Sequence, residues 1–492
     1  MASAWGYIHP DEFFQAQEVA AIRRHEFDVP TPWEFACNQP CRSAVLPLTA
    51  ASLPYAMVEL LGVGRGAMAS RAMLLAPRIV MCLLSFVLDW AAFRLAPLCG
   101  TPPRLAVLCL ATSWPMLLMQ SRPFSNSFEA AILSSLLVLW LAPPRALPRA
   151  AIGLTGGALL CVGLFFRFTI LFYSLPLLVT SLFSALRGRG HAATNWLARL
   201  PNTPPSLAHV SLGFLILFGG LVVLDSLFFA ADPLCVGRIK TETNSTAPDI
   251  LGAPLVLTPL NSLLYNLDVK NLAMHGLHPR ATHLVVNLPL LYGPLALVAL
   301  LSAAGTVISR LRAPATRSAG EMKGTAATVE WVLVGSCGLC GLLLLSLAPH
   351  QEPRFLLPLA LPLSLLFSSP LLPSQIPATA SGPHSAPATA GRFSSGRTTS
   401  SEEAAPPDRR GGTVSKAMSK ARARTGRARG SSPARSGPKD RFPVAASGEE
   451  KEGSRRASTG LGASRVFDCL LIDSCVCVCV CVCVCVCVCV CV

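Results

Sequence analysis

Two adjacent carboxylates near the start of the chain, Asp11 and Glu12, are the residues whose types and position first suggest chemistry. Pro10 fixes its own φ and disfavours a helical His9, so the two acids are predicted at a turn that opens a helix. Acidic residues in a first helical turn also favour the helix dipole, and many have no other role. The long hydrophobic sequence that follows them nevertheless favours a polar site beside a membrane.

The composition predicts an all-α multi-pass membrane protein. Of the 492 residues, 52% are hydrophobic and 14% are charged, and the mean hydropathy is +0.52. Apolar runs long enough, or nearly so, to cross a bilayer as helices lead us to expect about eight to ten spans. These runs cover residues 44–62, 72–98, 105–142, 150–186, 206–231, 281–311, 330–348 and 355–372.

The positive charge and the cysteines gather in the C-terminal part of the chain. The formal net charge is +15, and residues 392–465 alone carry 17 Lys or Arg against 7 Asp or Glu. We therefore predict a disordered basic tail over residues 374–465, which argues against nucleic-acid binding by the apolar body. Nine of the 19 cysteines lie in the Cys-Val repeat at the end of a low-complexity segment, 466–492, so neither a disulfide framework nor a metal site is predicted.

The basic residues also predict which loops share a side of the membrane. Arg65 and Arg71 follow the first apolar run, and Arg310 and Arg312 lie at the end of a later one, so both positions are predicted to be cytoplasmic. Residues 1–43 then form a lumenal loop, the first domain, ahead of a membrane domain over residues 44–373. By the same rule, a second polar block at residues 350–358 faces the lumen too, whereas the topology of residues 105–142 stays open.

Several polar blocks interrupt the apolar sequence. Residues 121–129 combine Arg122 with Ser, Asn and Glu, and residues 350–358 hold His350, Glu352 and Arg354. A third block, residues 258–287, contains Asn271 and three histidines whose spacing favours interfacial loop histidines over a zinc site.

These blocks resemble a known family. Residues 6–15, with Trp33-Glu34-Phe35 and Arg42-Ser43 behind them, resemble the first lumenal loop of the endoplasmic-reticulum mannosyltransferases that use dolichyl-phosphate-mannose. Residues 121–129 and 350–358 are similar to further motifs of that family, and residues 258–287 resemble its glycosylphosphatidylinositol (GPI) branch. The resemblance covers about residues 6–372.

The resemblance implies a GT-C-type membrane glycosyltransferase with large lumenal loops. Its expected reaction is an inverting transfer of mannose to the third mannose of a GPI precursor, which makes an α1,2 linkage in the lumen of the endoplasmic reticulum. The donor is the lipid-linked sugar dolichyl-phosphate-mannose, and no metal or other cofactor is expected. The implied site residues are Asp11 as base, with Glu12 second; Arg354, His350, Arg42 and Arg122 for phosphate groups; and Glu352, His275 and Asn271 as further candidates.

Three alternatives stay open at the level of sequence. A sister mannosyltransferase acting on another GPI mannose, or on lipid-linked oligosaccharide, would share most of the motifs. A transporter or scaffold would also carry intramembrane charges, such as Arg78 and Asp89, although no internal repeat is visible. An inactive truncated product is the third, because the helix that precedes the acidic loop in the family is missing here and the tail departs from the family pattern.

Overall fold

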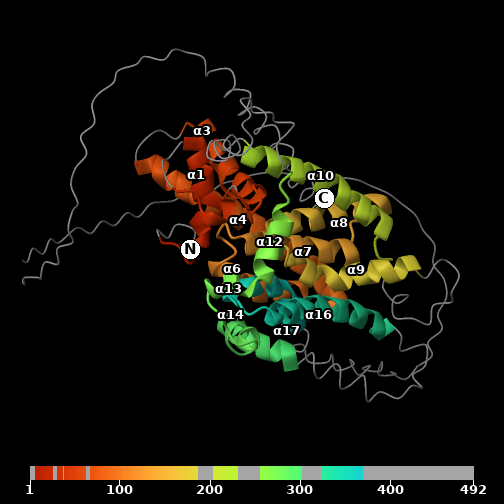
Figure 1. Cartoon of the computed structure of the whole chain (residues 1–492). Coiled ribbons are helices and arrows are strands. Elements are labelled where there is room, and N and C mark those ends of the chain that lie inside the picture. Colours follow the sequence, from red (N-terminus) through yellow and green to blue (C-terminus); the bar gives the residue numbers. More distant parts are fainter. Residues whose placement is uncertain are drawn as a thin grey trace, which may run out of the picture. The chain divides into compact units, whose positions relative to one another are not determined.

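The computed structural model describes residues 6–25, 30–36, 38–62, 67–186, 203–230, 255–301 and 323–368. Throughout these ranges every regular element is a helix (Figure 1). All of these described residues belong to one compact unit of the chain. The predicted basic tail, the Cys-Val repeat and residues 231–254 and 302–322 lie outside the described residues.

The helices follow one another along the chain, and most begin at a proline or after a polar turn. Pro103, Pro115 and Pro259 lie in the first turns of their helices. The backbone N–H groups of a first turn have no acceptor within the helix, so a proline, which lacks this N–H, breaks no hydrogen bond there. The bounds are α1 Glu18–His25, α2 Val45–Pro47, α3 Leu53–Leu60, α4 Ala67–Leu95, α5 Pro103–Ala111, α6 Trp114–Leu118, α7 Ser125–Leu141, α8 Arg149–Phe166, α9 Ile170–Leu186, α10 Leu207–Ala230, α12 Thr258–Leu267, α13 Val269–Ala273, α14 Leu288–Tyr292, α16 Lys323–Leu347 and α17 Ala360–Ser368.

Four of the described helical segments are long and apolar enough to cross a membrane, and a bent pair, His283–Tyr292 with Pro294–Leu301, would make a fifth. The four are Ala69–Cys99, Arg149–Phe166, Leu207–Ala230 and Val329–Leu347. Shorter apolar helices occupy Val45–Leu60, Ser125–Leu141, Ile170–Leu186 and Pro353–Leu366. The all-helical membrane class is confirmed.

Within the described residues, the expected eight to ten full spans are not reached, because polar and Gly or Pro residues divide the apolar runs. Arg167 adopts an extended backbone and separates α8 from α9. Gly293, at φ 50°, separates the two halves of the bent pair. The run at 105–142 divides into α5, α6 and α7.

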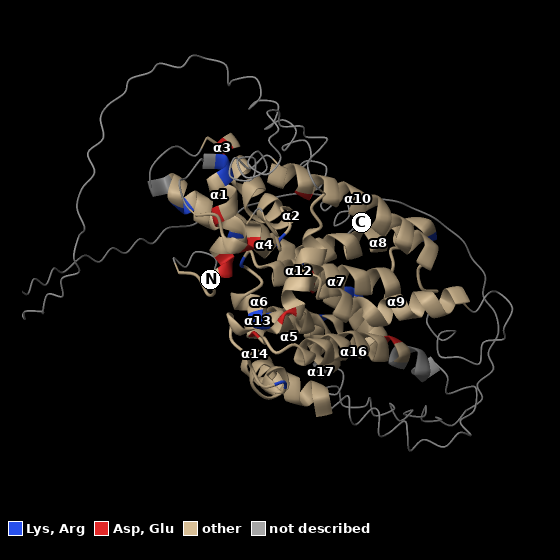
Figure 2. Ribbon diagram, in the orientation of Figure 1, with Lys and Arg blue, Asp and Glu red and all other residues tan. Residues whose placement is uncertain are grey.

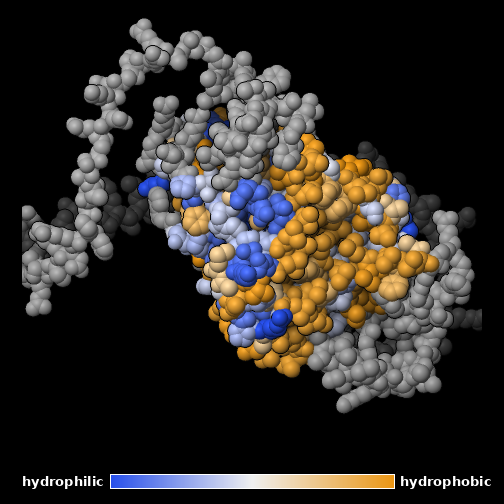
Figure 3. Space-filling model, in the orientation of Figure 1, coloured by the Kyte–Doolittle hydropathy of each residue, from blue (hydrophilic) through white to orange (hydrophobic). Residues whose placement is uncertain are grey.

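The helices present an apolar exterior that suits a bilayer. Charged residues are sparse along α8, α9 and α10 and more frequent towards the N-terminal segment (Figure 2). Hydrophobic side chains cover the face formed by the long helices, and hydrophilic ones gather beside it (Figure 3). Large apolar side chains such as Leu215, Ile216 and Leu343 are more than half exposed, as expected of groups that meet lipid.

Helices α8 and α10 pack with their backbones almost in contact. A Cβ atom on Gly157 would collide with the carbonyl oxygen of Val210, and one on Gly213 would collide with that of Leu154. Small residues at such a contact allow the close approach on which helix association in membranes depends. This pair connects to the site through Arg167, the residue directly after α8.

Candidate active site

A cavity of about 830 Å³ lies where the polar blocks meet. Its wall comes from the N-terminal segment, the 30–42 loop, the α8–α9 junction, α12 with α13, and the end of α16 with the loop after it. The polar and aromatic residues on this wall include His9, Asp11, Glu18, Trp33, Glu34, Arg42, Arg167, Thr169, Ser262, Tyr265, Asn266, His275, His350, Glu352, Arg354 and Phe355.

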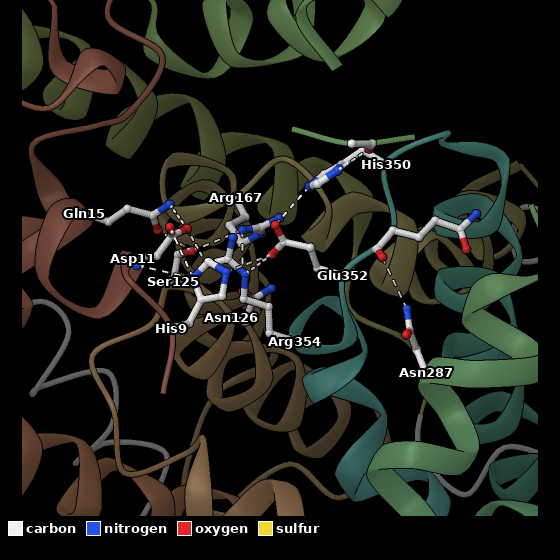
Figure 4. Close-up of polar contacts among 12 residues, drawn as sticks. His9, Asp11, Gln15, Ser125, Asn126, Arg167, Asn287, His350, Glu352 and Arg354 are labelled. Atoms are coloured by element: carbon white, nitrogen blue, oxygen red, sulfur yellow. Dashed lines mark hydrogen bonds and ion pairs between the residues drawn. The ribbon is translucent and has the colours of Figure 1, made fainter. Parts of the chain in front are cut away.

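A chain of ion pairs connects the first turn of the protein to the loop after α16 (Figure 4). The Arg354 guanidinium donates from Nη1 to Asp11 Oδ2 and from Nε to Glu352 Oε2. Glu352 Oε1 lies 3.0 Å from His350 Nε2, and His350 Nδ1 lies 3.0 Å from the carbonyl oxygen of Gly276. Two carboxylates and two basic groups, from segments 343 residues apart in the sequence, therefore meet in one cavity.

Asp11 is held by its neighbours as well as by Arg354. Gln15 donates from Nε2 to its Oδ2, and His9 Nδ1 lies 3.3 Å from its Oδ1. Gln15 follows by one helical turn, so the helix that begins after Pro10 fixes both residues on one face. The remaining approach to the carboxylate opens onto the cavity.

The charges of this cluster shift the pKa values of its members. Burial raises the pKa of Asp11. The hydrogen bond with His9 and the positive charge of Arg354 together lower it by more than burial raises it, so the net pKa lies well below the usual value of an aspartate. Burial also raises the pKa of Glu352, but the hydrogen bond with His350 and the positive charge of Arg354 lower it by more, so that its pKa falls to about 2. The hydrogen bond with Glu352 raises the pKa of His350 despite burial, so this imidazole holds a proton to higher pH than a free histidine does.

Glu12 points away from the cavity. Its side chain is fully buried, with Oε1 lying 2.6 Å from Arg78 Nε and 3.0 Å from Arg122 Nη1. Both arginines also donate to the carbonyl oxygen of Gly6. The two adjacent carboxylates thus face different surroundings, since Asp11 meets the cavity and Glu12 meets a buried cationic pocket that includes Arg122.

Replacing Glu12 with Gln should destabilise the protein and displace the N-terminal segment. The amide would leave two buried guanidinium groups without their shared negative charge, a loss of about 3–5 kcal/mol for a buried ion pair that loses one partner. Thermal unfolding of the purified protein would show the change as a lower melting temperature. Unchanged stability would mean that this contact does not anchor the segment.

A second polar layer includes residues that the sequence-based site prediction omitted. Arg167 lines the cavity beside Phe355, with its guanidinium carbon 4.6 Å from the ring centroid. Its Nη1 lies 3.3 Å from Ser125 Oγ, and Thr169 donates to Glu129 Oε1 at 2.6 Å. The sequence feature that could have identified Arg167 is its position within an apolar run. A charged side chain inside a membrane segment costs free energy unless it faces a cavity or pairs with another group.

The other predicted residues divide between the wall and its support. Arg42 and His275 line the cavity, and Arg42 Nε lies 2.9 Å from Glu34 Oε1. Asn271 lies behind the wall, where it donates to the carbonyl oxygen of Tyr265 at 3.4 Å. Among the residues that the structure describes, no group of three His, Cys, Asp or Glu side chains is placed to hold a metal ion.

Comparisons with known proteins agree in pointing to one kind of chemistry. Residues 1–391 match the sequence model of the Alg9-like mannosyltransferase family. The human protein called GPI alpha-1,2-mannosyltransferase 4 is 35% identical over 380 residues, which cover 74% of this chain and 60% of that protein.

Two other relatives carry the name GPI mannosyltransferase 4. The Drosophila melanogaster protein is 30% identical, over 75% of this chain and 56% of its own length. The Emericella nidulans protein is 35% identical, over 72% of this chain and 57% of its own length. The chain thus spans about 56–60% of the length of these relatives. No solved structure matched the chain.

Proposed function

Since the chain belongs to the Alg9-like mannosyltransferase family, we propose that it transfers mannose from dolichyl-phosphate-mannose to the third mannose of a GPI precursor. The new linkage is α1,2, and the reaction takes place on the lumenal side of the endoplasmic-reticulum membrane. The names of the relatives support this acceptor and linkage, and the apolar helices support a membrane-embedded lipid donor.

The observation that carries the proposal is the meeting of Asp11 with Arg354 and His350 on one cavity wall. Inverting transfer needs few groups. A carboxylate takes the proton of the acceptor hydroxyl as its oxygen attacks the anomeric carbon of the donor. The bond from that carbon to the phosphate oxygen breaks, and the lipid phosphate leaves with the electron pair.

The leaving phosphate needs positive charge more than it needs a proton. Arg354 offers several N–H donors in a planar fork, and protonated His350 adds a positive charge on the same wall. Such fixed donors stabilise the charge that grows on the departing phosphate. Asp11 takes the base role in this arrangement because Glu12 is enclosed by Arg78 and Arg122.

The cavity is apolar on another side, which suits the lipid part of the donor. Leucines of α12 and of the end of α16 line it, and several of them are also exposed on the outer surface. A prenyl chain lying against this wall would bury apolar area and leave its phosphate towards Arg354. The leucines that form this side are Leu263, Leu267, Leu344, Leu345 and Leu347.

The function is tested in microsomes from cells that lack the fourth-mannose activity. Expression of the chain should convert three-mannose GPI precursors into four-mannose precursors, which chromatography of the radiolabelled lipids would resolve. Conversion of a different GPI intermediate, or of lipid-linked oligosaccharide, would replace the proposed acceptor. A stably inserted protein that converts none of them would contradict the proposal.

The pH dependence of donor use should report the state of His350. Its pKa is raised above the usual 6.5, so the protonated form persists below 6.5 and is lost as the pH rises through the raised value. We expect the KM for the donor to be steady at lower pH and to rise above that point. His350→Asn should raise the KM at low pH and remove the dependence. An alkaline rise of the same size in this variant would exclude His350 as its source.

A further inference from the structure

Three rings on the cavity wall form an aromatic platform that the reaction described above does not use. Trp33 lies in the short helical turn Trp33–Phe35, and Tyr265 and His275 come from α12 and from the loop after α13. The Trp33 ring centroid lies 4.8 Å from that of Tyr265 and 5.4 Å from that of His275. Two segments more than 200 residues apart in sequence thus build one surface.

The platform remains open although its rings are held in place. The Trp33 side chain is 48% exposed, and all three rings belong to the cavity wall. Tyr265 Oη lies 2.9 Å from His275 Nε2, and Asn271 supports the backbone of Tyr265. Aromatic rings fixed in the wall of a cavity beside a few polar groups are typical of ligand-binding sites.

The surroundings of the platform indicate what kind of ligand would cover it. Ser262 and Asn266 contribute neutral polar groups to the wall nearby, whereas the cationic groups Arg354 and His350 belong to the part assigned to phosphate. A pyranose ring has an apolar C–H face that packs on aromatic rings and an edge of hydroxyl groups that needs hydrogen-bonding partners. Aromatic rings beside amide and hydroxyl groups match both requirements.

The platform also lies next to the predicted phosphate site. The His275 and His350 ring centroids are 5.8 Å apart, and His350 contacts Glu352. A sugar on the rings would therefore share one cavity with Asp11 and with the group that binds the leaving phosphate. This proximity is what an acceptor sugar needs if its hydroxyl is to reach the donor.

We propose that Trp33, Tyr265 and His275 form the binding site for a mannose ring of the acceptor glycan. This assignment rests on the proposed function for the choice of sugar, and it names the surface that recognises that sugar. Trp33 supplies the stacking face, and Tyr265 and His275 pack against its ring and hold that face in position. The three residues bind and orient the acceptor and take no part in the proton transfer.

Direct binding tests the platform separately from catalysis. The full chain is purified in nanodiscs, and binding of a methyl α-linked trimannoside is measured by saturation-transfer NMR. Trp33→Ala should weaken this binding about tenfold, the size of a lost stacking contact, whereas Trp33→Phe should retain most of the affinity. Trp114→Ala is the matched control, because Trp114 is a similarly exposed tryptophan that does not line the cavity.

A second probe identifies which mannose the platform holds. A short-chain prenyl-phosphate-mannose carries the donor sugar, and we expect Trp33→Ala to leave its binding unchanged. If Trp33→Ala unfolds, the exposed His275→Ala variant takes its place with the same expectation. The proposal is overturned if the wild-type chain does not bind the trimannoside, if Trp33→Ala binds it normally, or if only the donor analogue is affected.

The outcomes also separate this inference from the proposed function. Ring-dependent binding of the trimannoside with no transfer to three-mannose precursors would support the platform and contradict the reaction. Transfer that survives in Trp33→Ala with an unchanged acceptor KM would support the reaction and contradict the platform.

Discussion

Asp11→Asn is expected to lower the rate of mannose transfer by at least about a hundredfold, the lower end of what a positioned general base contributes. The amide keeps the size of the side chain and still has an oxygen that can accept from Gln15 and Arg354. It cannot take a proton from the acceptor hydroxyl. The expected loss therefore lies in kcat, with the donor KM less affected, and conversion of three-mannose to four-mannose precursor in microsomes measures it.

A matched control separates chemistry from general damage. Glu59 is a half-exposed carboxylate that forms an ion pair with Arg24 at 2.7 Å, and such surface pairs add little to stability. Glu59→Gln should leave both transfer and membrane insertion as in the wild-type chain. Asp11→Asn should also insert normally. Wild-type turnover in Asp11→Asn would remove Asp11 from the base role.

The different surroundings of Asp11 and Glu12 illustrate what sequence analysis can and cannot provide. Pro10 and the apolar sequence after it predicted both carboxylates at a turn beside the membrane domain, and a helix does begin at that turn. Adjacent residues point in different directions on a helix, so the choice between them depends on what surrounds each one. The partners of Glu12, Arg78 and Arg122, are 66 and 110 residues away, and no local pattern specifies such contacts.

The same reasoning applies to the cavity as a whole. The positive-inside rule predicted that residues 1–43 and 350–358 share one side of the membrane, and Asp11 and Arg354 do lie in contact. Of the platform residues, His275 was a predicted site candidate, whereas Trp33 and Tyr265 were not, and neither was Arg167, because their significance comes from residues brought together by folding. Helix boundaries were the least predictable feature. The break at Arg167 could be expected from a charged residue within an apolar run, whereas Gly293 divides a run whose composition is continuous.

Arg354→Ala is expected to reduce kcat for transfer by about 10²–10³, comparable to the removal of a donor that stabilises developing charge. The leaving lipid phosphate loses a planar set of N–H donors, and His350 alone cannot replace them. Arg354→Lys should recover only part of the rate, because an ammonium group restores the charge without the fork geometry. Initial rates at varied dolichyl-phosphate-mannose concentration measure both variants, and unaltered donor kinetics in Arg354→Ala would contradict the assignment.

The Arg354→Ala variant should also change its pH profile in a direction that mere structural damage would not produce. Arg354 is one of the groups that lower the pKa of Asp11, whereas burial raises it. Removing the arginine should therefore raise the pKa of Asp11, so that protonation of the base begins at higher pH than in the wild-type chain. In a plot of kcat/KM against pH, we expect the fall on the acid side to occur at higher pH in Arg354→Ala than in the wild-type chain. In the wild-type chain it should occur below the usual pKa of an aspartate.

The shift also bears on how the two groups cooperate. Because Asp11 and Arg354 are paired with each other, a phosphate that draws the Arg354 donors towards itself weakens the attraction that holds the pKa of Asp11 down. If Asp11 is the base, donor binding would then make it a stronger one at the moment the acceptor needs it. An acid limb at the same pH in Arg354→Ala and the wild type would show that the pair does not couple donor binding to the base.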